Sequence, residues 1–104
     1  MKLNYEYRKI RSNYEITILA HSSANIILGN QYIPEGCLGI LDPLKFNECY
    51  GIYGTRQILN AGDHAITVTL ENRTSEMVPF ETGCVMAELR IINIDKILEN
   101  AEAE

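Results

Sequence analysis

The clearest run of alternating apolar and polar residues lies in the second half of the chain. From Ile66 to Glu71, isoleucine, valine and leucine occupy every second position, and threonine and glutamate fill the positions between them. A period of two places the apolar side chains on one face of a β-strand and the polar side chains on the other. The segment is therefore predicted to be a strand with one buried and one solvated face.

Two further apolar runs follow this strand. Turn residues at Asn72–Ser75 and Glu81–Gly83 separate the runs Met77–Phe80 and Cys84–Ile92. Pro79 has no N–H to give to a ladder, so the shorter run is expected at a sheet edge or a bulge. Together these consecutive strands are predicted to form a meander. In the longer run the residues expected on one face are Val85, Ala87, Leu89 and Ile91.

The first part of the chain has the same kind of pattern. Apolar and polar residues alternate from Leu3 to Arg8 and again from Tyr14 to Ile18, and the turn Arg11–Asn13 lies between them. Two alternating runs joined by a short turn predict a hairpin. Its first strand presents an aromatic face, with Tyr5 and Tyr7, that is expected to need cover.

Three further strands are predicted upstream of Ile66. Ala24–Leu28 is expected to end at a turn formed by Gly29 and Asn30. Cys37–Leu41 contains Gly39, which permits a bulge or the close approach of another segment. Gln57–Leu59 is a brief strand, and turn residues follow it directly.

Short strands separated by glycine, proline and asparagine predict an all-β fold, either a β-barrel or a jelly roll. Asp95 can cap a short C-terminal helix formed by residues 96–101. With 104 residues the chain is expected to be one domain, consisting of a β-barrel over 1–94 and a helix with its tail over 95–104.

The two best-defined segments resemble a known superfamily. Ile66–Asn72, a short hairpin and Gly83–Leu89 are similar to the C-terminal half of the dUTPase and dCTP deaminase superfamily. In that superfamily a strand ending in asparagine is followed by a hairpin and a Gly-Asp-Arg-Ile-Ala-Gln-Leu-type strand. The resemblance implies a dUTPase-like β-barrel that assembles as a homotrimer.

The resemblance also implies catalytic positions, and this chain does not fill them. The family's aspartate falls at Leu59 or Asn60, neither of which is a carboxylate that could act as a base. Its tyrosine falls at Gly62 or Asp63. Glu88 replaces the family's glutamine and places a negative charge where the family meets phosphate. The Arg-Ser-Ser and glycine-rich tail motifs are not found, so no catalytic residue is assigned; Asp63 and Glu88 are the remaining candidates.

Composition narrows the function classes. The net charge of −5 argues against general nucleic-acid binding, which relies on clustered Lys and Arg. No apolar run approaches the roughly 20 residues of a membrane span. The N-terminus lacks the apolar stretch of a secretory signal, so a cytoplasmic or virion location is expected.

Cysteine and histidine usage predicts neither a disulfide framework nor a metal site. Cys37, Cys49 and Cys84 are odd in number and widely spaced, which favours buried free thiols. His21 and His64 are each isolated from other ligand-type residues. No cofactor is therefore expected, except Mg²⁺ if the chain hydrolyses nucleotides.

The sequence leaves three functional hypotheses. The first is a non-catalytic, homo-oligomeric structural module, such as a decoration or accessory protein in a virus or phage particle. The second is a nucleotide-sequestering protein in which Tyr50, Tyr53 and Arg56 contact the ligand; these residues are otherwise candidates for a subunit interface. The third is a divergent dUTP or dCTP pyrophosphatase.

Overall fold

The structure is a computed structural model that describes residues 5–43 and 51–95, which contain nine β-strands. The strands are β1 (Tyr5–Arg11), β2 (Ile16–Ile18), β3 (Ser23–Ile33), β4 (Cys37–Pro43), β5 (Ile52–Gly54), β6 (Gln57–Leu59), β7 (Gly62–Asn72), β8 (Val78–Phe80) and β9 (Val85–Asn93). The all-β prediction is confirmed. The helix predicted at residues 96–101 lies outside the described residues.

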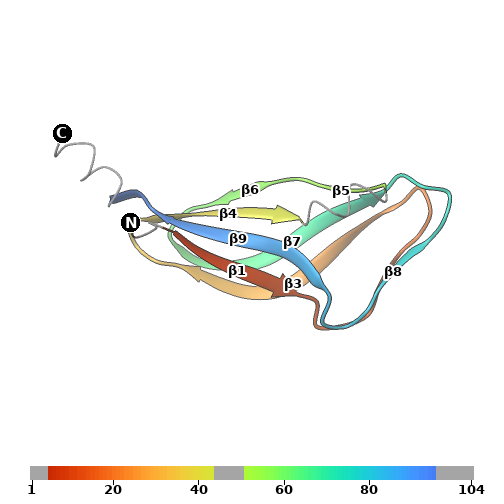
Figure 1. Ribbon diagram of the computed structural model, residues 1–104, viewed down its shortest axis with the longest axis horizontal. Helices are drawn as coiled ribbons and strands as arrows, with labels where there is room; N and C mark the ends of the chain where they lie inside the picture. The colour runs from red at the N-terminus through yellow and green to blue at the C-terminus, as the bar shows by residue number, and fades with distance from the viewer. Residues whose placement is uncertain (1–4, 44–50, 96–104) are drawn as a thin grey trace.

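The strands form three antiparallel sheets. Their orders are β1-β9-β4-β6, β3-β7-β5 and β2-β8. Figure 1 shows the two larger sheets running along the length of the molecule, with β8 at one end. Pro79 lies in β8, a strand that pairs only with β2. The predicted edge position is therefore confirmed, because no second strand needs an N–H from Pro79.

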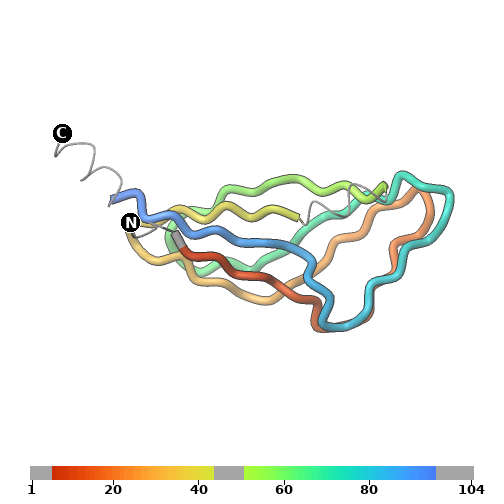
Figure 2. The backbone as a smooth tube through the Cα atoms, in the orientation of Figure 1, coloured from red at the N-terminus to blue at the C-terminus, as the bar shows by residue number. Residues whose placement is uncertain are grey.

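The predicted N-terminal hairpin and C-terminal meander are wrong. β1 pairs with β9 and β2 pairs with β8, so strands adjacent in sequence separate and their partners come from the other end of the chain (Figure 2). Likewise β7 pairs with β3 and β5, not with β8. Alternation shows which side chains face the core, but it carries no information about which strand lies alongside.

The hydrophobic core fills the space between the larger sheets. The predicted buried face of β7 is confirmed, since its apolar side chains are almost completely enclosed. The fully enclosed apolar side chains include Ile18, Ile26, Ile33, Leu41, Ile52, Ile66, Val68, Leu70, Met86 and Leu89. Gly39 allows this packing, because a Cβ atom there would lie 2.8 Å from Cδ1 of Ile33.

One predicted turn is instead a bulge in a continuous strand. Ile27 lies opposite Thr67 and Asn30 opposite Ala65, so β3 contains one more residue than β7 over this stretch. Gly29 adopts φ = 85°, which glycine reaches without the steric cost of a Cβ atom. The Gly29–Asn30 pair thus bends β3 without ending it.

A second bulge changes the predicted face of β9. Arg11 lies opposite Val85 and Ile10 opposite Ala87, which leaves Met86 as the extra residue. Met86 and Ala87 are both fully buried, whereas Val85 is partly exposed. The expectation that Val85 shares the buried face with Ala87 is therefore wrong, because a bulge breaks the period of two.

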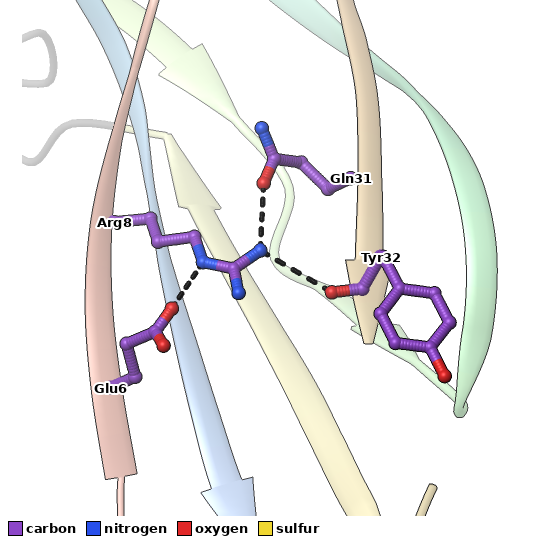
Figure 3. Close-up of polar contacts among 4 residues, drawn as sticks. All are labelled: Glu6, Arg8, Gln31 and Tyr32. Atoms are coloured by element: carbon purple, nitrogen blue, oxygen red, sulfur yellow. Dashed lines mark hydrogen bonds and ion pairs between the residues drawn. The ribbon is translucent and has the colours of Figure 1, made fainter. Parts of the chain in front are cut away.

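The aromatic face predicted for β1 does not enter the core at Tyr7. Tyr7 is 54% exposed, and it is Ile10 whose side chain enters the core. Arg8 points across to β3, where it donates to the side-chain oxygen of Gln31 at 3.0 Å and to the carbonyl oxygen of Tyr32 at 3.3 Å (Figure 3). Glu6 forms an ion pair with the same guanidinium. Arg8 thereby links the edges of the two larger sheets.

Candidate functional site

A hollow of about 490 Å³ lies on the outer face of the β3-β7-β5 sheet. Strand register builds its floor, because Ser23 of β3 and Tyr53 of β5 both lie opposite Glu71 of β7. Residues directly opposite each other in antiparallel strands point to the same face of the sheet. His21 and Arg73, in the segments just before β3 and just after β7, complete the walls.

Three side chains in this hollow form a connected group. The guanidinium of Arg73 lies 4.0 Å from the centroid of the Tyr53 ring, a cation–π contact. The same guanidinium lies 3.3 Å from the carboxylate of Glu71. Both members of the ion pair are more than half exposed, so the pair itself adds little stability. Its effect is to hold a donor group and an acceptor group side by side.

The backbone around the hollow is held by Asn72, which is fully buried at the end of β7. Its side-chain amide donates to the carbonyl oxygens of Ile18, Leu19 and Glu76 at 2.8–3.2 Å. Its side-chain oxygen accepts from the N–H and the hydroxyl of Thr74 at 2.9 and 2.7 Å. A buried polar side chain with all of these bonds satisfied joins two loops rigidly.

Backbone bonds attach the walls to this centre. The N–H of Asn72 donates to Ser22 at 2.8 Å, that of Arg73 to Gly51 at 2.9 Å, and that of His21 to Thr74 at 3.1 Å. Two of these bonds join residues 21–22 to residues 72–74, and the third joins Arg73 to the segment before β5. The hollow is therefore formed in advance of any ligand.

His21 has a φ of 52°, and among the described residues it is the one non-glycine residue with a positive φ. This left-handed conformation costs an ordinary side chain about 1–2 kcal/mol. Strain of this kind persists where the surrounding structure imposes it, and it is concentrated at binding and active sites.

The structure separates the predicted ligand or interface residues. Tyr53 lines the hollow, whereas Tyr50 lies outside the described residues. Arg56 binds Asp42 with two hydrogen bonds of 2.6 and 3.1 Å on the other large sheet. The hydrogen bond from Arg56 to the Asp42 carboxylate, together with its negative charge, raises the pKa of Arg56. Arg56 is thus committed to a carboxylate.

The two candidate catalytic acids lie apart from each other and from the hollow. Asp63 is exposed at the start of β7, and it is separated from Glu71 by about 27 Å at a strand rise of ~3.4 Å per residue. Glu88 lies in β9 between Lys9 and Asp42. Arg56 and Arg90 both lie against the carboxylate of Asp42 there, so these two cations are already engaged by an acid.

The two positions that the resemblance implies for the catalytic aspartate, Leu59 and Asn60, have other roles in the structure. Leu59 is buried in the core at the end of β6. The carbonyl oxygen of Asn60 lies 2.6 Å from Nε2 of His64, so this histidine stabilises the turn between β6 and β7. Both residues have structural roles here.

Other chemistry is not assembled within the described ranges 5–43 and 51–95. No group of three or more His, Cys, Asp or Glu side chains there could hold a metal ion. Cys37 and Cys84 are free thiols, and Cys49 lies outside these ranges. None of the described helical structure is long and apolar enough to cross a membrane.

Sequence reasoning missed most of the hollow. It noted His21 as an isolated histidine and Asn72–Ser75 as a turn, but it did not connect His21, Glu71 and Arg73 with Tyr53. They come from separate segments that only the antiparallel pairing of β3, β5 and β7 brings together. The available signal was the Asn72-Arg73-Thr74 turn, whose polar residues follow directly after a buried strand.

The fold of this chain is similar to that of known proteins, although its sequence is not. No protein-family model and no curated protein matches the sequence. Among solved structures, a mutant dUTPase of Staphylococcus bacteriophage 80alpha with dUpNHpp is similar, with a TM-score of 0.72, 17% identity, and coverage of 83% of this chain and 75% of that one.

A second phage dUTPase and a further mutant of the 80alpha enzyme give comparable scores. A mutant dUTPase from phage phi11 of S. aureus gives a TM-score of 0.69 at 14% identity, covering 86% of this chain and 90% of its own. Another mutant of the 80alpha phage dUTPase gives 0.69 at 14% identity, covering 90% and 86%. The resemblance seen in Ile66–Leu89 thus extends over most of the chain, which has a dUTPase-like fold.

Proposed function

We propose that this protein is a non-catalytic, homo-oligomeric dUTPase-like module that acts through protein contacts, as a structural or accessory part of a virus or phage particle. The observation that carries the proposal is Leu59. By the resemblance the family's aspartate falls at Leu59 or Asn60; Leu59 is buried in the core, neither residue is an acid, and the fold is dUTPase-like. Asp63 and Glu88 lie on different sheets, and neither lines the hollow.

The similar solved structures support a regulatory or structural role in a phage context. The 80alpha mutant with dUpNHpp is described with the statement that phage dUTPases control the transfer of virulence genes by a proto-oncogenic G protein-like mechanism. The other 80alpha mutant is described through the link between enzymatic activity and SaPI-inducing capacity. The fold therefore has a precedent for acting in ways other than nucleotide hydrolysis alone.

One row of side chains on the four-stranded sheet supports a subunit contact. Register places Tyr7, Arg90, Ile40 and Ile58 side by side across β1, β9, β4 and β6. Tyr7 and Ile58 are 54% and 56% exposed. Tyrosine, arginine and aliphatic residues together are typical of the centre of a protein interface. We assign this row, hereafter the outer row, to contact with a second copy of the chain.

The charges beside the outer row fit such a contact. Lys9 and Glu88 lie opposite each other, and Arg56 binds Asp42 in the same part of the sheet. Positive and negative groups thus balance there, although the whole chain carries a net charge of −5. Two acidic copies can approach on this face with little mutual repulsion.

Native mass spectrometry and light scattering of the full chain test the assembly. The wild-type protein is expected to be a homo-oligomer, with a trimer as the implied state. Ile58→Asp is expected to give monomers, because it places a charge in the apolar contact. Ile27→Asp is the matched control, since Ile27 is 62% exposed on the other large sheet and its replacement leaves the oligomer intact. A monomeric wild type contradicts the proposal.

A turnover assay tests the absence of catalysis separately. With dUTP or dCTP and Mg²⁺, the wild-type protein is expected to release no pyrophosphate. Turnover that disappears in Asp63→Asn or Glu88→Gln would instead establish the pyrophosphatase alternative. For the nucleotide-sequestering alternative, thermal-shift measurements with 2′-deoxynucleoside triphosphates should show no stabilisation, because Arg56 is held by Asp42.

A further inference from the structure

The hollow formed by His21, Tyr53, Glu71 and Arg73 has no part in the proposed subunit contact. It lies on the β3-β7-β5 sheet, whereas the outer row and Glu88 lie on the other large sheet. Its walls are held by backbone hydrogen bonds, and the turn Leu19–Ser22 keeps His21 at a positive φ beside them, so the hollow is a preformed candidate site for a ligand.

The charges in the hollow select the ligand chemistry. Glu71 lies at the centre of the floor, so a phosphate group would meet a carboxylate. Arg73 neutralises that carboxylate from 3.3 Å away and offers N–H donors beside it. The hollow therefore combines a strong acceptor and a strong donor with little net charge.

Vicinal hydroxyl groups match this combination. Each hydroxyl can donate to the carboxylate of Glu71 and accept from the guanidinium of Arg73. Carboxylates bind ribose hydroxyls in this way in dinucleotide-binding folds. The hydroxyl-bearing side chains around the rim, which can bond further hydroxyls of a ligand, are Ser22, Ser23, Thr55 and Thr69.

Preorganisation compensates for the exposure of the Glu71–Arg73 pair. Stacking on Tyr53 fixes the plane of the Arg73 guanidinium, and the backbone N–H of Arg73 is bonded to Gly51. A ligand therefore does not have to order a long side chain, which removes part of the entropic cost of binding.

We propose that this hollow binds a sugar ring carrying vicinal hydroxyls, either as a free saccharide or as the ribose of a ribonucleoside. The two sources share one recognition chemistry. They differ in whether a base attached to the ring adds affinity.

Chemical-shift titration of the full-length protein tests the proposal, with D-ribose, adenosine, 2′-deoxyadenosine and inorganic phosphate as probes. Backbone amides of residues 21–23, 53–55 and 69–73 are expected to shift with ribose and adenosine. Deoxyadenosine, which lacks one hydroxyl of the pair, is expected to bind at least about tenfold more weakly than adenosine. A tenfold preference for adenosine over ribose identifies the nucleoside as the source, and equal binding identifies the saccharide.

Single substitutions test whether Glu71 and Arg73 bind the sugar. Arg73→Gln and Glu71→Gln are expected to weaken ribose or adenosine binding about tenfold or more. Arg56→Gln removes another exposed arginine that is paired with an acid, and it is expected to leave the affinity unchanged. His21→Gly is expected to weaken binding without lowering Tm, a combination that a purely structural role would not produce.

Three results would overturn the proposal. They are equal binding of adenosine and deoxyadenosine, binding of phosphate in preference to both, and no shift with ribose or adenosine at millimolar concentration. The comparison of the two nucleosides uses only the wild-type protein, so it stands even if a variant fails to fold.

Discussion

Asn72 donates a hydrogen bond of 3.1 Å from its side-chain amide to the carbonyl oxygen of Ile18. Asn72 ends β7 and Ile18 ends β2, so one buried amide joins a large sheet to the two-stranded sheet at the end of the molecule. The same side chain also holds Leu19, Thr74 and Glu76. These bonds explain why the last buried position of β7 is a polar residue.

Asn72→Ala is expected to destabilise the protein by about 3 kcal/mol, because it leaves several buried backbone groups without partners. Urea unfolding of the full chain measures the loss. Asn25→Ala is the control, since Asn25 is exposed and accepts a single hydrogen bond, from the Thr69 hydroxyl. If the two variants lose equal stability, Asn72 does not have the central role described here.

Gly39→Ala is expected to cost about 1–3 kcal/mol by overpacking the core. The added Cβ atom would lie 2.8 Å from Cδ1 of Ile33, the atom that Ile33→Val removes. The double variant is therefore expected to lose less stability than the sum of the two single variants. Strict additivity in a double-mutant cycle would show that the clash is relieved elsewhere.

His21→Gly is expected to raise the free energy of unfolding by up to about 1 kcal/mol, because glycine adopts positive φ without the Cβ clash. The backbone of His21 has a φ of 52°, which is in this positive region. His64→Gly provides the contrast and is expected to destabilise, because His64 lies in β7 and bonds the carbonyl of Asn60. Differential scanning calorimetry distinguishes the two outcomes. A lower Tm for His21→Gly would show that its side chain contributes to stability.

The ion pair of Arg56 and Asp42 is expected to contribute equally at pH 6 and pH 9. The pKa of Arg56 is raised by the hydrogen bond and the charge of Asp42. For a raised pKa the stabilisation is fully present below the unfolded-state pKa and is lost only as pH rises through the still higher folded value. The difference in urea midpoint between wild type and Arg56→Gln should thus be the same at both pH values. A difference that shrinks by pH 9 would mean that another group titrates.

The candidate site could be predicted only in part. Tyr53 was identified from its place between glycines, and the lack of a carboxylate at Leu59 and Asn60 followed from the resemblance. Glu71 and Arg73 could not be recognised, because their significance depends on β5 pairing with the end of β7. His21 could not be recognised either, since its N–H bonds the carbonyl oxygen of Thr74, a contact between segments far apart in the chain.

The sequence by itself determined the all-β class, the approximate positions of most strands and the buried face of β7, because these depend on local periodicity and turn chemistry. Only the tertiary structure decided which strands pair, where Met86 and Gly29 form bulges, and which polar side chains meet around Asn72. The physical reason is that periodicity specifies the face of a strand, whereas its neighbour and register are selected by packing among segments far apart in the chain.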